Sequence, residues 1–514
     1  MAKIYEIENR VLVPNWRDFK RTVLIGELAD NNKPIRKPID NSIVKRDWQN
    51  SKTIGVAADL ISSSFISNDM FSEELQEAIK YVEANKFEAS IPLLSLIDKI
   101  KSENNPSGEN SNMILEMSIK SAEEFRAFVD SSVIDKMVSK TRNLTKEYTS
   151  NAIYWVELAR LYTIKNQNIK AEKCIRVALN LAPDNRFVLR SAVRFFTHIH
   201  EEEKAIYYLK KSKSIKEDPW LISAHIATSK LINRYSPFIK NGIDLITSKK
   251  FSDFELTELA SSVGSLELEN GSFKRSKPYL DLSIANPNDN SLAQFEWLRK
   301  KESKLILKAN LFNEVKNPFE AFTYENYKNG NFKDSIKNCI NWFLDVPYSK
   351  RPLMFGSYLA ALIGDFDLSI FLCLVGLKSN KREVGFINNI VYAYCLKNEL
   401  SQVPQYLSLI DKNIIEELSV EEFIMLQATI GLYNIRQNNI EEGKRFYEIA
   451  LSNSHNRKIK YSYDLALINY TRELFLIKDI EFNKRFEEMN DIESVEIDIL
   501  ANKQQVMDLI NKSY

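Results

Sequence analysis

One stretch of the chain carries a basic side chain at every fourth position. These residues are Arg186, Arg190, Arg194 and His198. Residues four apart share one face of a helix, so the side chains form a longitudinal stripe there. Guanidinium and imidazolium groups bind carboxylates and phosphates. Like charges at this spacing cost an exposed helix a few tenths of a kcal/mol per pair, so the stripe predicts either an acidic neighbour within the protein or a ligand.

Two further basic residues extend the stripe to neighbouring helices. Arg160 precedes Arg194 by 34 residues, which is also the period of the surrounding sequence. Equivalent positions on adjacent packed helices lie within roughly 10 Å, so Arg160 should lie beside Arg194. His225 falls on the next helix of the same kind. The candidate binding surface therefore comprises Arg160, Arg186, Arg190, Arg194, His198 and His225.

An internal ion-pair network is the alternative role for the stripe. Glu157 could pair with Arg190, and the carboxylates of residues 201–203 could neutralise the end of the stripe. Long arginine stems also cover apolar groove walls without binding anything. The sequence leaves a ligand site and an internal network both open.

Signatures of catalysis are missing from the sequence. It contains no phosphate-binding glycine loop, no His-Glu-x-x-His, no Gly-x-Ser-x-Gly and no dinucleotide fingerprint. His198 and His200 are two residues apart, so on a helix they would point to different faces and be poor ligands for one metal ion. The cysteines show no zinc or disulfide spacing, and Cys339 and Cys373 are predicted to be small buried hydrophobes. We predict no enzyme activity, no cofactor and no metal site.

Composition and charge narrow the class of protein. The 514 residues include 70 Lys and Arg against 69 Asp and Glu, and the net charge of +1 gives no global attraction to nucleic acid or anionic membranes. A hydrophobic content of 44% with only 13 Gly and 14 Pro predicts an ordered, mostly helical body. Residues 1–10 show no secretory signal, so we expect a cytoplasmic protein. The apolar stretch 354–377 is interrupted by Asp365 and Asp367, which predicts two short buried helices rather than a membrane span.

The elements that must position the stripe come from a repeat of 34 residues. Residues 152–219 contain two consecutive copies, with large and small side chains at matching positions. Large residues such as Leu158 and Tyr162 lie on one stripe of a first helix, while Ala159 and Ala171 let a second helix approach closely. Pro183 follows the second helix, where no further turn is wanted.

With these positions the chain resembles tetratricopeptide repeat proteins. The resemblance implies an all-α helical-repeat solenoid whose first helices line a concave groove, and it implies that the basic stripe faces that groove. The carboxylate-clamp version of the fold uses asparagine and lysine at fixed positions. This chain has Arg160 and Arg194 in place of the asparagines and Val156 in place of a lysine. A role in binding chaperone tails is therefore not supported.

The repeat extends toward the C-terminus. The strongest support is a series of turn triplets 34 residues apart at 330–332, 364–366 and 398–400. Further units are predicted around a second helix opening at Pro237, a turn at 271–273 and a turn at 438–440. The phase slips between 304 and 315, which predicts a longer helix or a joint.

The predicted organisation places repeats in the middle and caps at both ends. The solenoid has a short irregular N-terminal region and a helical C-terminal cap. The boundaries are 1–110 for the N-terminal region with an isolated repeat at 71–104, 111–151 for connecting helices, 152–303 and 304–457 for two runs of repeats, and 458–514 for capping helices.

The function predicted from these features is a non-enzymatic scaffold or adaptor. It would hold a peptide segment or a partner protein on the concave face, without nucleic acid or membrane as a partner. Residues 184–190 together with 218–221 also resemble uncharacterised bacterial repeat proteins, which implies a component of a bacterial multi-gene system. One alternative is a peptide-responsive regulator with a DNA reader around residues 47–65. Another is polyanion or RNA binding in an arginine-lined groove, with strong salt dependence.

Overall fold

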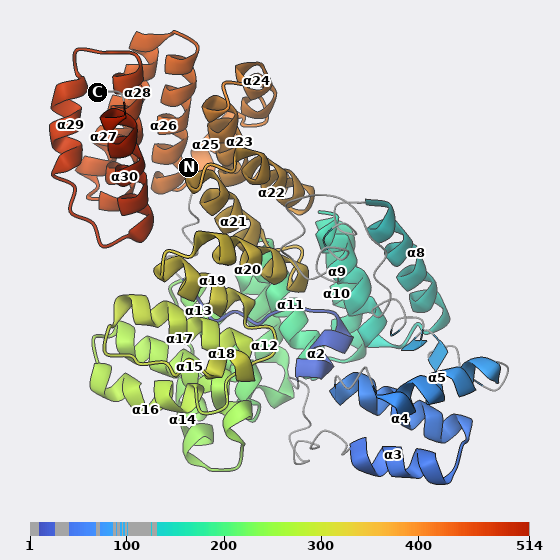
Figure 1. Ribbon diagram of the computed structural model, residues 1–514. Coiled ribbons are helices and arrows are strands. Elements are labelled where there is room, and N and C mark those ends of the chain that lie inside the picture. Colours follow the sequence, from blue (N-terminus) through green and yellow to red (C-terminus); the bar gives the residue numbers. More distant parts are fainter. Residues whose placement is uncertain are drawn as a thin grey trace. The chain divides into compact units, whose positions relative to one another are not determined.

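The computed structural model shows a helical protein in which the described residues form two compact units (Figure 1). The larger unit joins Met1–Asp18 to Phe125–Tyr514, and the smaller unit is Phe19–Glu124. All regular elements among the described residues are helices. The structure describes residues 10–25, 41–67, 72–85, 131–512 and positions 89, 93–94, 96–97, 100 and 125.

The smaller unit has its own apolar core. Its helices are α2 (Phe19–Ile25), α3 (Asn41–Asn50), α4 (Ile54–Ser67) and α5 (Glu73–Ala84). Trp48, Leu60 and Ile79 pack together in this core, and the Trp48 indole donates a hydrogen bond to Glu77 at 3.1 Å. The predicted isolated repeat at 71–104 is described only in part: α5 forms its first half, and most of its second half lies outside the described residues.

The larger unit is an array of antiparallel helix pairs. Helix α8 (Ser131–Glu147) precedes the first pair. The first helices of the pairs are α9 (Ala152–Ile164), α11 (Arg186–His198), α13 (Pro219–Leu231), α15 (Asp253–Glu269), α17 (Asp289–Lys301), α19 (Phe319–Lys328), α21 (Lys350–Leu362), α23 (Val384–Leu396), α26 (Val420–Arg436) and α28 (Lys460–Leu476). The second helices are α10 (Asn168–Leu181), α12 (Glu202–Lys211), α14 (Ile239–Thr247), α16 (Phe273–Ser283), α20 (Phe332–Asp345), α22 (Phe366–Ser379), α24 (Val403–Leu407), α27 (Ile440–Asn456) and α29 (Phe482–Asn490).

Short elements fill the remaining places. They are α18 (Leu311–Glu314), α25 (Lys412–Glu417), α30 (Ile497–Asn511) and the 3-10 helices η2 (Lys213–Lys216) and η3 (Leu400–Gln402). Helix α17 has only the short α18 after it and packs directly against α19. The phase slip between 304 and 315 is therefore a joint, not a longer helix.

The turns inside the pairs repeat with the predicted period. Asn166, His200, Gly330, Gly364 and Asn398 all have a left-handed backbone, with φ between 54° and 82°. In each case the next helix begins two residues later. A left-handed residue lets the chain leave one helix and start the next at once, and glycine and asparagine tolerate that conformation best. The turn triplets predicted from the sequence are confirmed.

The packing positions of the two central copies also agree with the sequence. Ala159, Ala171 and Ala178 are completely buried between helices, and Leu158 and Tyr162 are buried beside them. The apolar stretch 354–377 is confirmed as two helices, α21 and α22, separated by the turn at Gly364 and Asp365. Among the described residues no helix is long and apolar enough to cross a membrane.

Candidate functional site

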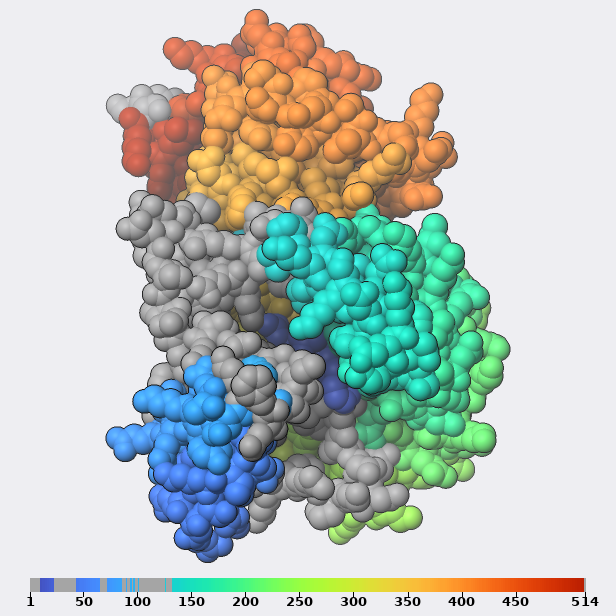
Figure 2. Space-filling model, turned by 90° about the vertical axis from the view of Figure 1, so that its right-hand side faces the viewer, coloured from blue at the N-terminus to red at the C-terminus, as the bar shows by residue number. Residues whose placement is uncertain are grey.

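An extended segment of the chain's own N-terminal part lies against the first helices of the array. Residues 10–18 have no regular secondary structure, and most of their side chains are buried. We call the side of the array formed by successive first helices the inner face, and residues 10–18 the strap. The strap contacts helices from α11 to α20. Figure 2 shows the surface of the helices with which this array begins, in cyan to green.

Arg10 anchors one end of the strap in a fully polar site. Its Nε and Nη2 donate to the two carboxylate oxygens of Glu320 at 2.9 and 3.0 Å. Its Nη1 and Nη2 also donate to Gln294 and Asn290, each at 2.7 Å. Burial alone would raise the pKa of Glu320, but the charges of Arg10 and Arg351 outweigh it and lower the pKa to about 2. Glu320 is thus a permanent anion that binds guanidinium groups.

Arg17 anchors the other end between two aspartates. Its guanidinium binds Asp345 through Nε and Asp289 through Nη2. Asn15 also donates to Asp289, at 2.9 Å. Burial raises the pKa of Asp289 to about 6, because the Arg17 charge only partly offsets burial and the nearby Asp345 adds repulsion. This end of the site holds two carboxylates around one guanidinium.

Trp16 fills an aromatic site between the two charged ends of the strap. Its ring lies 6.2 Å from Phe195 at a steep angle and 5.4 Å from Tyr348. The side chain is 1% exposed. Edge contacts of this kind add to the free energy of burying a large ring, so the indole binds here by both area and geometry.

A fourth carboxylate, Glu258, completes the polar surface beneath the strap. It accepts two hydrogen bonds from Arg190, at 2.8 and 3.1 Å, and further ones from Asn288 and Asn290. Desolvation opposes ionisation of Glu258, but the Arg190 charge and these hydrogen bonds lower its pKa. We call Glu258, Asp289, Glu320 and Asp345 the acidic floor. All four are at least nine-tenths buried.

The predicted basic stripe does face this side of the array, but most of its charges are neutralised internally. Arg190 pairs with Glu258 and stacks over Trp220 at 4.9 Å. Arg186 donates to Asp218 at 2.6 Å. Glu157, the carboxylate proposed above for Arg190, lies three residues from Arg160 on α9 and accepts a hydrogen bond from it at 3.3 Å. Arg190 also has a carboxylate partner 68 residues away, Glu258, which the sequence did not indicate.

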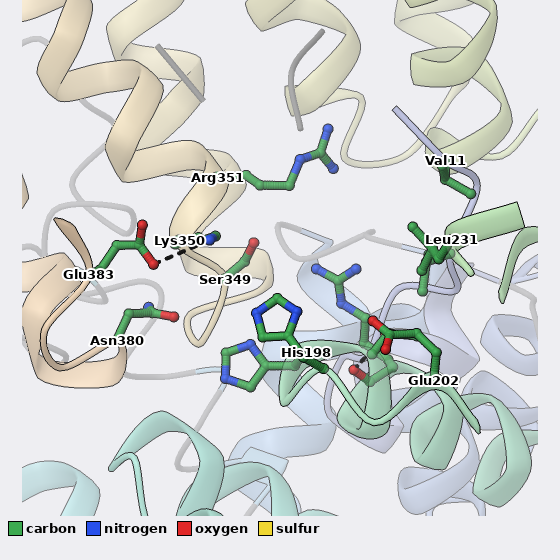
Figure 3. Close-up of a pocket in the computed structure, with 13 residues that line it drawn as sticks. Val11, His198, Glu202, Leu231, Ser349, Lys350, Arg351, Asn380 and Glu383 are labelled. Atoms are coloured by element: carbon green, nitrogen blue, oxygen red, sulfur yellow. Dashed lines mark hydrogen bonds and ion pairs between the residues drawn. The ribbon is translucent and has the colours of Figure 1, made fainter. Parts of the chain in front are cut away.

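A small pocket lies where the stripe ends. It has a volume of about 190 Å³ and is lined by the strap and by the ends of several helices. Its lining includes Val11, Val13, Arg194, Thr197, His198, His200, Glu202, Ser349, Lys350, Asn380 and Glu383. The Lys350 Nζ lies 3.2 Å from the Glu383 Oε2. In Figure 3 both side chains face His198 across the pocket. The Arg194 Nε is buried and has no hydrogen-bond partner among the described residues.

Two histidines, His198 and His200, point in directions that differ from the prediction. His198 and His200 were expected on different faces of a helix, but α11 ends at His198 and the left-handed turn at His200 brings both to the same pocket. The described residues contain no group of three His, Cys, Asp or Glu side chains that could hold a metal ion. Both histidines therefore line a surface that also carries Arg194.

His225 is not brought to the pocket. It is 1% exposed within α13, and its Nδ1 shares hydrogen bonds with Ser236 at 2.9 Å and Ser229 at 3.1 Å. Its ring packs edge-on against Phe238. Burial lowers the pKa of His225 to about 4, with a smaller contribution from the Lys210 charge. The side chain is thus a neutral core group at physiological pH.

The strap and the acidic floor were not found from the sequence. Arg10, Trp16 and Arg17 lie in a region that shows no repeat, and the polar partners of the two arginines are more than 270 residues away. A local clue exists in Asp289 and Glu320, which are acidic residues in the first turns of α17 and α19. Only their burial distinguishes them from ordinary solvated carboxylates.

Comparisons with known proteins add little to this geometry. No protein-family model matches the chain, and no curated protein matches it. The chain is similar to the crystal structure of yeast Tom70, with 14% identity over 77% of this chain and 95% of that chain and a TM-score of 0.31. It is also similar to the human IFIT1 dimer with PPP-AAAA, with 10% identity over 93% and 96% of the two chains and a TM-score of 0.31. The fold assignment rests on the chain's own helix pairs, which have the architecture that the tetratricopeptide resemblance implies.

Proposed function

We propose that this protein is a non-enzymatic scaffold or adaptor that binds an extended segment of a partner protein along the inner face of its helix pairs. The observation that supports this is the strap, because the inner face already binds an extended segment through anchors for two arginines and a tryptophan. Stacked repeats supply the stability, while each first helix contributes a few side chains to the surface. We further propose a cytoplasmic location and a place in a bacterial multi-gene system.

Photo-crosslinking in the native host tests this proposal at a defined position. A photoreactive amino acid replaces His200, which is exposed and lines the pocket. The matched control places it at Ile480, which is 92% exposed in the turn before α29. We expect one discrete protein adduct from position 200 and none from position 480. Adducts from position 480 alone would move the binding surface away from the inner face.

Polyanion binding is the second candidate function, and the pocket is the observation that favours it. Arg194 and Lys350 both line the pocket, together with the two histidines. The acidic floor adds no positive charge for a long polyanion, because its four carboxylates are paired with Arg10, Arg17, Arg190 and Arg351. Binding of a labelled single-stranded RNA by the full chain at rising salt measures this directly. A steep loss of affinity with salt supports the polyanion, and a flat response excludes it.

The regulator alternative needs a DNA-binding part. Its candidate segment, residues 47–65, spans the end of α3 and most of α4, where Trp48, Leu60 and Ile61 are buried in the core of the smaller unit. A gel-shift experiment with the full chain at low salt tests it. No shift at micromolar protein would exclude this role.

A further inference from the structure

Resting on the proposed function, we infer that the strap is a displaceable internal occupant of the inner face, and that the partner it excludes is a protein segment with arginine and tryptophan in the same order. The site has three parts in a fixed sequence. An arginine site, formed by Glu320, Asn290 and Gln294, is followed by an aromatic site and then by a second arginine site. The partner segment therefore carries Arg, then Trp six residues later, then Arg next to it.

The buried carboxylates of the inner face determine what charge a bound segment must carry. Glu258 and Glu320 have arginines of the array itself as partners, namely Arg190 and Arg351. Asp289, by contrast, binds the Arg17 guanidinium of the strap. An occupant without a cation would leave this carboxylate buried without its counter-charge, which is strongly unfavourable. A neutral or acidic segment is thus excluded from this part of the inner face.

Arginine is preferred to lysine because of the shape of the first site. Arg10 donates four hydrogen bonds in a planar fork to Glu320, Gln294 and Asn290. A lysine ammonium is a point charge with three donors and cannot reproduce this fork. The site therefore discriminates between the two basic residues.

Two features make the strap replaceable. It precedes α2 in sequence and does not connect two helices of the array, so its departure interrupts no helix pair. Its fit also leaves buried polar atoms unsatisfied. The Asp289 Oδ1 and the Trp16 Nε1 have no hydrogen-bond partner within the part of the chain that the structure describes. A segment that donates a hydrogen bond to the Asp289 Oδ1 would bind better than the strap does, whereas the unsatisfied Trp16 indole leaves together with the strap.

A labelled peptide of residues 10–18, Arg-Val-Leu-Val-Pro-Asn-Trp-Arg-Asp, tests the inference by fluorescence polarisation on full-length protein. In the intact chain the tethered strap competes at a high effective concentration, so the peptide should bind weakly. Trp16→Ala weakens the internal competitor, and we expect the peptide to bind at least 10-fold more tightly to this variant. Arg10→Lys is a milder variant that keeps the charge and should shift affinity in the same direction.

Further variants of the protein and of the peptide test whether the peptide binds at the site that the strap occupies. Adding Asp289→Asn and Asp345→Asn to the Trp16→Ala variant should weaken peptide binding by at least 10-fold, because the second arginine site loses its charge. Glu473→Gln, far along the array on α28, should leave peptide affinity unchanged. A peptide with both arginines replaced by lysine should bind at least 10-fold more weakly.

Several outcomes would overturn the inference. Equal peptide affinity for the intact chain and for folded Trp16→Ala and Arg10→Lys variants would show that the strap does not compete. Loss of folding in both variants, seen by circular dichroism, would show that the strap is a permanent part of the core. A doubled mass with exchanged straps would make a second copy the partner.

Failure of the inference is distinguishable from failure of the proposed function. If only the inference fails, the peptide stays unbound while position 200 still gives a protein adduct in the host. If only the proposed function fails, the Trp16→Ala variant binds the peptide but position 200 gives no adduct.

Discussion

The middle of the array and its C-terminal section both bury carboxylates, but they neutralise them differently. In the middle section, α11–α20, the carboxylates of the acidic floor take part of their counter-charge from the strap, more than 270 residues away in sequence. In the C-terminal section, α21–α30, Glu473 is paired with Arg436 at 2.5 Å and with Arg472 at 2.8 Å, both from the array itself.

This difference indicates which of the two sections binds a separate cationic segment. A buried ion pair whose two partners belong to packed helices forms when those helices pack and has no reason to open. A buried carboxylate whose cation arrives on a separate segment needs that segment or a substitute for it. The middle section therefore has a requirement for a cationic occupant that the C-terminal section lacks.

The largest expected effect is at Arg17. Arg17→Met leaves Asp289 and Asp345 buried without this guanidinium, and we expect the free energy of unfolding to fall by about 4 kcal/mol at pH 7. Denaturant unfolding measures this loss. Combining it with Asp289→Asn and Asp345→Asn should recover most of the stability. Arg485→Met, whose partner Glu448 is 42% exposed, is the control and should lose far less.

The second largest effect is expected in the middle section, where the free energy of unfolding should depend on pH because of His225 in α13. In the folded chain the pKa of His225 is about 4, below its ordinary value of 6.5. As pH falls from 6.5 to 4 the unfolded chain takes up a proton that the folded chain does not, so stability is lost over this window, by roughly 3 kcal/mol. His225→Asn should lack this component. Denaturant unfolding of both proteins between pH 7 and 4 measures the difference, and parallel curves would contradict the prediction.

A smaller effect is expected in the C-terminal section. Glu473→Gln removes the charge that faces Arg436 and Arg472, whose side chains are 24% and 14% exposed. Since these arginines are partly hydrated, we expect a loss of about 2 kcal/mol, less than for Arg17→Met. Denaturant unfolding measures it. A loss larger than that of Arg17→Met would reverse the comparison between the two sections.

The smallest effect is expected for an ion pair on the outside of the C-terminal section. Arg445 and Glu442 pair at 2.5 Å, but the two side chains are 61% and 45% exposed. Exposed pairs at this spacing contribute little, because both ions are already well solvated. Arg445→Ala should not change the denaturation midpoint measurably. A clear change would show that the unfolding experiment also reports on surface charge.

Local features made much of the fold predictable. The alanines at Ala159 and Ala171 and the turn at Gly364 indicated helix pairs of a definite period, and each occupies the expected place. The partners of the basic stripe were not predictable in the same way. The sequence suggested Glu157 on the preceding first helix, whereas the structure places Glu258, two first helices further along the chain, against Arg190 and Glu157 beside Arg160.

The sequence by itself determined the all-α array, because its period, its small residues and its turn residues act between neighbours in the chain. Only the tertiary structure decided what the inner face binds. Arg10 and Arg17 meet Glu320, Asp289 and Asp345 across 270 residues or more, and no local pattern encodes such a pairing. Burial then turns ordinary surface charges into a specific site, since a carboxylate removed from water needs a cation or hydrogen-bond donors beside it.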